Sequence, residues 1–237
     1  ARGAVIGSSL ANIMSAAGYA VTREYYINDA GNQMQLFFES VLARYHELLG
    51  SSYQLPEGGY QGDYIKDVAE LLHAEFGESL IGNSDAINEM AKFSTDTMLN
   101  AISEDLFELQ VEFDNWFSEK SLFGSDEYRD TIGELESKNY LKEMDNALWF
   151  VSTILEEEKD NVIVKSTGEP TYFASDIAYH RNKFKTREFD QVIDIWGADH
   201  QGHISRLKAA MRALDIDDSK LKILISQMVT LKKGEEV

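Results

Sequence analysis

Residues 189–203 read FDQVIDIWGADHQGH, and the first half of this stretch, up to Trp196, has the β-branched and aromatic composition of a buried strand. Gly197 interrupts the run, and we expect a helix from about Gln201 to Leu214. Leu221–Ile225 (LKILI) then begins another strand. Strand, helix and strand in this order predict a βαβ unit of a doubly wound parallel α/β sheet.

The same alternation occurs in two other parts of the chain. Asn161–Lys165 is expected to be a strand, and Tyr172 to about Phe184 a helix. Near the start we expect a helix over about 3–17, a strand over Tyr19–Ile27 and a helix over about Asn32–Leu49. This order is half of a βαβ unit whose opening strand is missing, so the predicted sheet is incomplete.

The middle of the chain has a different pattern. After a Gly-rich loop, apolar residues recur at helical spacing from Ile65 to Phe76 and again from Phe93 to Phe117. We therefore divide the chain into residues 1–50 and 161–237, the first and second parts of the α/β fold, and a mainly helical connective insertion over residues 51–160.

Composition and charge exclude several classes of function. The 237 residues include no cysteine, which excludes disulfides and thiolate zinc sites. No apolar run reaches the roughly 18 residues that span a bilayer, so we expect a cytoplasmic protein without a membrane partner. The net charge of −19 is the wrong sign for gripping phosphates, and we expect the chain alone to bind RNA weakly. Residues 104–160 carry 17 acidic and 5 basic residues, a local balance of −12, typical of a solvated helical face.

The first candidate site follows the strand that ends at Trp196. Ligands of open parallel sheets bind beyond the carboxyl ends of the strands, where Gly197 would permit close approach and Asp199 would accept hydrogen bonds from a ribose diol. His200 and His203 lie one helical turn apart and would face the same site. Two alternatives stay open: Asp199 as a simple helix N-cap, or Asp199, His200 and His203 as metal ligands.

A second candidate pair is Tyr172 and Asp176. Their spacing of four places them on one face of the expected helix. An aspartate beside a phenol hydroxyl can hold a guanidinium through charge-assisted hydrogen bonds. The alternative is an ordinary surface aspartate with the tyrosine packed on the helix, and His180, one turn further, is more often a packing or capping residue than a ligand.

Several blocks of sequence resemble the class I arginyl-tRNA synthetases of bacterial type. They are TYFASDIAYH (171–180), FD (189–190), IWGADH (195–200), YINDAGNQ (26–33) and DNALWF (145–150), the last followed by KD (159–160) and VIVK (162–165). The resemblance covers residues 1–45 and 145–233 strongly. It is weaker in the middle, which would correspond to the family's insertion between the two halves of its Rossmann-like, nucleotide-binding catalytic fold.

The resemblance implies ATP-dependent formation of arginyl-adenylate and transfer of arginine to its tRNA, with Mg²⁺ accompanying ATP and no structural metal. By similarity, Tyr172 and Asp176 would bind the arginine side chain, and His200 would lie near its α-carboxylate. Gly197 and Asp199 would lie against the adenosine ribose.

The chain departs from the family by lacking two motifs that act on phosphate. The HIGH motif would come just before Ala1, and Ser226–Val237 resembles the approach to a KMSKS-type loop. The resemblance also implies an N-terminal domain and an anticodon-binding domain, and we expect neither of them within these 237 residues. We therefore expect no catalytic residue within this fragment, and no activity from the fragment alone.

Two other functions compete with this interpretation. One is a non-catalytic, synthetase-like binding or scaffold module that docks a partner through its acidic helical segment. The other is a metal-dependent hydrolase at Asp199, His200 and His203.

Overall fold

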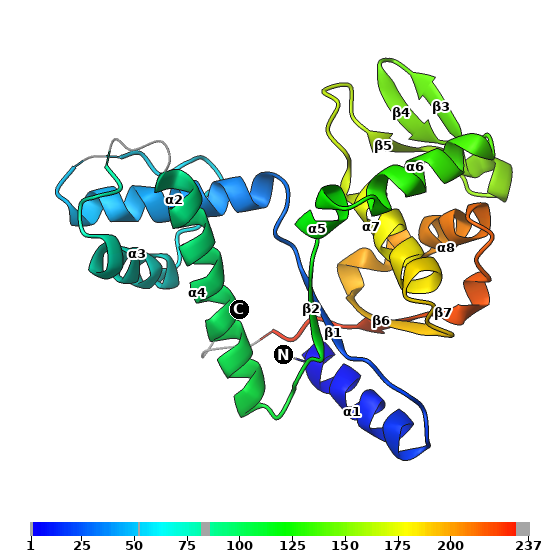
Figure 1. The fold of residues 1–237 in the computed structure, drawn as a ribbon, viewed down its shortest axis with the longest axis horizontal. Coiled ribbons are helices and arrows are strands. Elements are labelled where there is room, and N and C mark those ends of the chain that lie inside the picture. The colour runs from blue at the N-terminus through cyan, green and yellow to red at the C-terminus, as the bar shows by residue number, and fades with distance from the viewer. Residues whose placement is uncertain (1, 52, 82–85, 231–237) are drawn as a thin grey trace. The chain divides into compact units, whose positions relative to one another are not determined.

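The computed structural model describes residues 2–51, 53–81 and 86–230, and the chain forms two compact units (Figure 1). Unit 1 comprises Ala1–Ile27 and Phe113–Val237, and unit 2 comprises Asn28–Glu112. The predicted boundaries at residues 50 and 160 divide the chain by function and not by compactness, and that division stays a prediction.

Unit 1 contains two pairs of parallel strands. β1 (Glu24–Ile27) pairs with β2 (Asn115–Ser118), and β6 (Val192–Gly197) pairs with β7 (Leu221–Ser226). β6 continues into a short 3₁₀ helix, η3 (Ala198–His203), then α8 (Ile204–Ala213) and η4 (Asp218–Lys220) before β7. Because this crossover joins parallel neighbours, the βαβ unit predicted from residues 189–225 is confirmed. The predicted strand from Tyr19 is shorter than expected, since only Glu24–Ile27 pairs.

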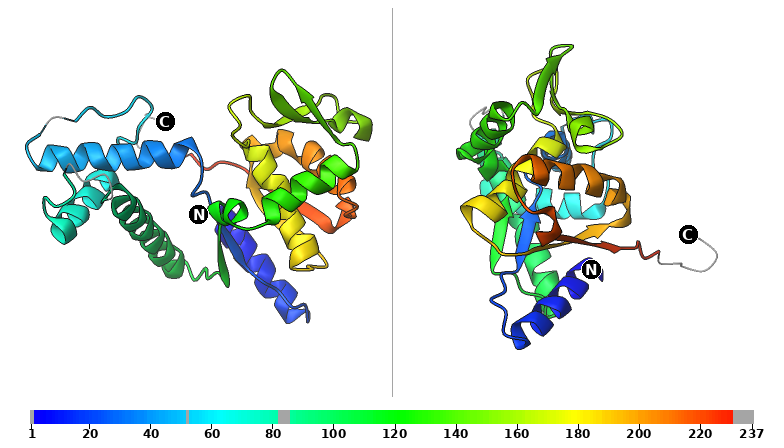
Figure 2. Two further views of the ribbon diagram at one scale, coloured as in Figure 1. Left: turned by 45° about the horizontal axis from the view of Figure 1, so that its top comes forward. Right: turned by 90° about the vertical axis from the view of Figure 1, so that its right-hand side faces the viewer.

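Helices lie on both faces of β6, as a doubly wound sheet requires. α1 (Arg2–Ala16) is on one side, where Gly3 and Gly7 lie against Ile195. α7 (Tyr172–Arg181) and α8 are on the other side, which Asp194 faces (Figure 2). Successive residues of a strand point to opposite faces, so Asp194 and Ile195 necessarily meet different helices.

α7 is the central helix of unit 1. The Thr171 hydroxyl caps its start by accepting from the Ala174 N–H, and eight consecutive residues, Phe173–His180, are buried. The core around it includes Phe150, Ile177 and Met211, none more than 1% exposed. After Arg181 the chain widens into η2 (Asn182–Thr186), a π-helical turn, whereas the sequence predicts continuous α-helix to about Phe184.

The segment before α7 contains the strand predicted over Asn161–Lys165 and two further strands that the sequence did not predict. β3 (Leu141–Met144), β4 (Ala147–Phe150) and β5 (Asn161–Val164) form an antiparallel sheet, with η1 (Ser152–Leu155) between the last two. Asp145 and Asn146, both at positive φ, make the two-residue turn between β3 and β4. Residues 51–160 are predicted to be mainly helical, and β3 and β4 are strands within this range that helical periodicity did not indicate.

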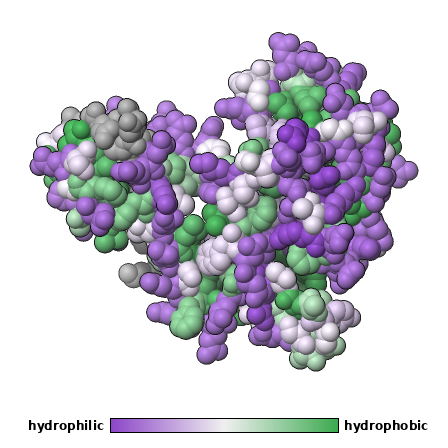
Figure 3. All heavy atoms as spheres, viewed as in Figure 1, coloured by the Kyte–Doolittle hydropathy of each residue, from purple (hydrophilic) through white to green (hydrophobic). Residues whose placement is uncertain are grey.

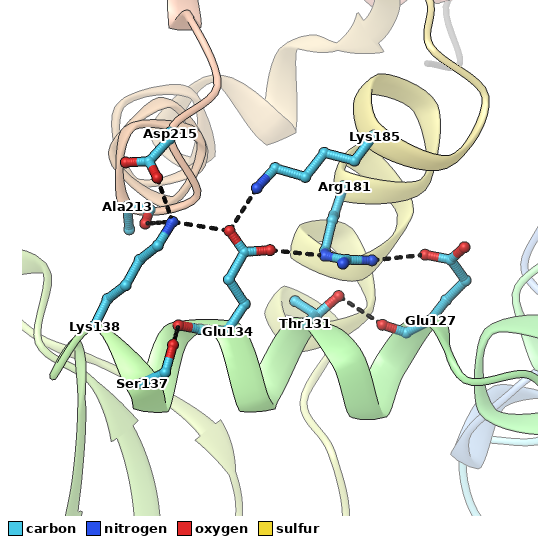
Figure 4. Close-up of polar contacts among 9 residues, drawn as sticks. All are labelled: Glu127, Thr131, Glu134, Ser137, Lys138, Arg181, Lys185, Ala213 and Asp215. Carbon is cyan, nitrogen blue, oxygen red and sulfur yellow. Dashed lines mark hydrogen bonds and ion pairs between the residues drawn. The ribbon is translucent and has the colours of Figure 1, made fainter.

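A polar network connects three helices of unit 1 (Figure 4). On α6 (Glu127–Ser137), which follows α5 (Lys120–Gly124), Glu134 accepts from Arg181 Nε at 3.1 Å and from Lys138 Nζ at 2.8 Å. Lys185 also donates to Glu134, and Lys138 reaches Asp215 beyond α8 at 2.7 Å. These contacts tie α6 to α7 and to the end of α8.

Unit 2 is helical, with α2 (Asn32–Leu48), α3 (Asp63–Phe76) and α4 (Ala86–Glu108) around a core that includes Tyr45, Ile65 and Leu72. α4 ends at Glu108, and Phe117 lies on β2, so the prediction of one helical run to Phe117 is wrong.

Hydrophilic side chains predominate on the face of the molecule drawn in Figure 3. Within the described residues, no helix combines the length and the apolar character needed to cross a membrane.

Candidate functional site

The first group of predicted residues lies at the carboxyl end of β6. Gly197 precedes η3, and Asp199 and His200 lie within it. The Asp199 carboxylate folds back so closely over Gly197 that a Cβ at position 197 would collide with it. The helix N-caps here are Gly197 and His203, and neither η3 nor α8 has a side-chain cap hydrogen bond, so the interpretation of Asp199 as a simple N-cap is wrong. Its side chain is 70% exposed and available to a ligand.

Aromatic rings connect this strand end to the start of α7. The centre of the His200 ring lies 6.4 Å from that of the Tyr172 ring, 5.9 Å from that of Trp196 and 5.6 Å from that of His203. Tyr172 is 44% exposed although it begins a helix that is otherwise buried. The structure thus brings Tyr172 and His200 together, next to Gly197 and Asp199.

Asp176 lies one turn along α7 from Tyr172 and is 7% exposed. Burial raises its pKa to about 8, and the negative charges of Asp194 and Glu119 add to this, while Lys183 and Arg206 oppose it. The pKa of Tyr172 is also raised, first by burial and then by Asp176. A buried carboxyl in this setting gains most from a cation placed directly against it.

Three buried polar atoms near these residues have no hydrogen-bond partner within the described part of the chain: Tyr26 Oη, His203 Nδ1 and Arg206 Nε. Burial raises the pKa of Tyr26, with Glu119 and Asp176 contributing. Burial lowers the pKa of His203, with Arg206 and His200 contributing. Buried polar atoms normally find partners, so these atoms fit a site that a polar ligand completes.

The sequence did not single out Asp194 or Lys183, nor assign a role to His180. All three are buried, and Asp194 is hydrogen-bonded to both His180 and Lys183. One signal was available: Asp194 is the sole charged residue in the apolar run from Val192 to Trp196. Its partners come from two other elements, Lys183 from η2 and His180 from α7, 11 and 14 residues earlier, and only the folded chain brings them together.

The alternative of a metal centre does not fit this geometry. Among the residues that the structure describes, no three His, Cys, Asp or Glu side chains are placed so that they could hold a metal ion. Asp199, His200 and His203 all belong to the described residues. The described geometry therefore gives no support to the metal-hydrolase interpretation of these three residues.

Comparison with known proteins identifies the family. Residues 1–235 match the family described as tRNA synthetases class I (R), catalytic domain. The chain belongs to this arginyl-tRNA synthetase family. Relatives named arginine–tRNA ligase include those of Dehalococcoides mccartyi, 50% identical over 100% of this chain, and Carboxydothermus hydrogenoformans, 48% identical over 100%.

Solved structures agree with the family. A putative arginyl-tRNA synthetase of Campylobacter jejuni superposes with a TM-score of 0.89 at 36% identity, over 99% of this chain and 52% of that one. The arginyl-tRNA synthetase of Thermus thermophilus, at 17% identity and a TM-score of 0.64 over 94% of this chain and 44% of its own, shares the fold. The chain spans 43% of the Dehalococcoides relative and 42% of the Carboxydothermus relative, and it is part of a synthetase catalytic domain. The predicted class I fold and family are confirmed.

Proposed function

We propose that the intact protein attaches arginine to its tRNA in an ATP-dependent reaction that proceeds through arginyl-adenylate. The observation that carries the proposal is a buried carboxyl, Asp176, beside the half-exposed Tyr172 in a member of the arginyl-tRNA synthetase family. A guanidinium would meet the carboxylate and the phenol hydroxyl together, which gives paired, charge-assisted hydrogen bonds.

Each predicted residue has a role in this proposal. Tyr172 and Asp176 bind the arginine side chain, and His200, whose ring lies near that of Tyr172, is placed for the α-carboxylate. Gly197 and Asp199 bind the ribose of ATP at the carboxyl end of β6. Mg²⁺ arrives with ATP, and tRNA is the second substrate. The same proposal assigns residues 1–50 and 161–237 to the two parts of the catalytic fold and residues 51–160 to the insertion between them.

Recognition of arginine follows from the state of Asp176. A bound guanidinium stabilises the ionised carboxylate, so binding releases the proton that burial retains near neutral pH. A neutral isostere such as citrulline would leave the buried carboxyl poorly paired, and sites of this kind reject such analogues by about 10⁴-fold. We therefore expect strong selection of arginine over citrulline.

The full-length protein tests the proposal in an ATP–pyrophosphate exchange assay. Arginine should support exchange, and citrulline and lysine should not. The 237-residue chain, which contains neither a HIGH nor a KMSKS motif, should show no exchange, and it should bind RNA weakly because its net charge is −19. Absence of arginine-dependent exchange by the full-length protein would favour the alternative, a non-catalytic binding or scaffold module. We expect the protein in the cytoplasm.

A further inference from the structure

Three charged side chains form a buried cluster behind the proposed arginine site. Asp194 on β6 accepts from Lys183 Nζ at 2.9 Å through Oδ1 and lies 2.7 Å from His180 Nε2 through Oδ2. The exposed fractions are 1% for His180, 7% for Lys183 and 9% for Asp194. Burying charged groups costs free energy, and an apolar replacement is often at least as stable. Stability alone therefore does not explain the cluster.

The cluster touches Asp176 through its backbone. His180 Nδ1 lies 2.7 Å from the Asp176 carbonyl oxygen, which can only accept, so this ring nitrogen carries a hydrogen. The other ring nitrogen, Nε2, lies against the Asp194 carboxylate, so the ring is held at both ends. A chain of contacts therefore runs from β6 through His180 to the turn of α7 that carries Asp176.

Lys183 enters the cluster because the helix changes its winding. It lies in the π-helical turn η2, directly after α7, and its Nζ is 3.9 Å from the centre of the Tyr179 ring. Single π-turns of this kind are frequent at functional sites. Lys183 Nζ thus donates to Asp194, and its positive charge also acts on Asp176.

We propose that Asp194, His180 and Lys183 are positioning residues that hold Asp176 in place and set its charge for binding the arginine guanidinium. The inference rests on the proposed function. Asp194 anchors His180 and Lys183, His180 fixes the backbone of Asp176, and Lys183 supplies the positive charge that favours the ionised carboxylate.

Lys183 and Asp194 have opposite effects on the pKa of Asp176, and this difference makes the inference testable. Lys183 lowers the pKa of Asp176, whereas Asp194 raises it. Removing the Lys183 charge should therefore move the titration of Asp176 to higher pH, and removing the Asp194 charge should move it to lower pH. The charged and titratable groups that face Asp176, from every element packed around it, are Asp194, Glu119, Lys183, Arg206, Tyr172 and Tyr26, with His180 on its carbonyl.

The experiment measures arginine-dependent exchange by the full-length protein between pH 6 and 9, for wild type, Lys183→Gln, Lys183→Arg and Asp194→Asn. In wild type, kcat/KM for arginine should rise with pH up to about 8, the pKa of Asp176. Lys183→Gln should raise this midpoint by about one pH unit, which lowers kcat/KM roughly tenfold at pH 7 because one unit is a factor of ten. Lys183→Arg should restore the midpoint, and Asp194→Asn should lower it. KM for ATP should change by less than about twofold in each variant, since the substitutions remove no contact that the proposal assigns to ATP.

The inference predicts that the pH midpoint rises in Lys183→Gln and falls in Asp194→Asn. Either substitution therefore tests the inference even if the other prevents folding. A purely structural cluster would lower activity without moving the midpoint, or would move it in the same direction in both variants, and either result overturns the inference. A wild type without arginine-dependent exchange refutes the proposed function instead. Exchange with unmoved midpoints refutes only the role of the cluster.

Discussion

Glu134→Gln tests how strongly the network in Figure 4 stabilises unit 1. Burial alone would raise the pKa of Glu134, but hydrogen bonds from Lys138, Lys185 and Arg181 outweigh it and lower the pKa from 4.5 to about 2. A shift of this size corresponds to roughly 3 kcal/mol. The side chains of Lys138 and Lys185 are 27% and 32% exposed, and solvent screening reduces the expected loss to about 1–2 kcal/mol.

The pH dependence has a definite sign. A carboxyl whose folded pKa is lowered contributes its full stabilisation above its unfolded pKa, here near 4.5, and loses it as the pH falls towards about 2. The difference between wild type and Glu134→Gln should be constant from pH 7 to about 5, and it should fall to less than half by about pH 3.

Urea unfolding of the 237-residue chain, followed by tryptophan fluorescence, measures this difference. All three tryptophans, Trp116, Trp149 and Trp196, belong to unit 1, so the signal reports the unit that contains Glu134. Glu136→Gln, an exposed residue of the same helix, is the matched control and should shift the unfolding free energy by less than about 0.5 kcal/mol. Equal effects of the two substitutions at neutral pH, or a difference that persists unchanged at pH 3, would refute the reasoning.

Three further predictions concern the core, a cross-element ion pair and the ATP site. Phe150→Ala removes a fully buried ring packed on the core and should cost about 3–5 kcal/mol in urea unfolding. Glu24→Gln should destabilise unit 1 at pH 7 and less below about pH 4, since Arg187 and other donors outweigh burial and lower the pKa of Glu24. Gly197→Ala should leave the unfolding midpoint nearly unchanged but weaken ATP binding, because the new Cβ displaces the exposed Asp199 carboxylate. Unchanged ATP affinity would remove Gly197 from the site.

The βαβ unit was predictable because local signals agree with the fold. The run from Val192 to Trp196, the break at Gly197 and the second run from Leu221 all indicate strand, turn and strand without reference to distant contacts. The positions of Tyr172 and Asp176 followed similarly, since their spacing in an intact helix fixes a common face.

Other features depend on information that periodicity does not carry. Leu109, Phe113 and Phe117 continue the apolar period of α4, but the helix has already ended: Gln110 adopts φ 57°, and the Val111 N–H donates to the Leu106 carbonyl at 2.9 Å. Glycine usually occupies such a position, so glutamine gave no warning.

The cluster around Asp194 was hidden for a different reason. Its partners come from α7 and η2, and no local pattern connects them to β6. The hairpin between β3 and β4 was within reach, since Asp145 and Asn146 tolerate the left-handed backbone that its two-residue turn requires.

Calorimetric titration of the full-length protein with arginine tests the central claim, that Asp176 binds the arginine side chain. Asp176→Asn should weaken arginine binding by at least about 30-fold, the lower end of the cost of removing one partner of a buried charge pair. ATP affinity should be unchanged, and so should arginine affinity in the control Asp145→Asn, an exposed turn position where asparagine is equally tolerated. Arginine binding by Asp176→Asn as tight as that of wild type would contradict the assignment.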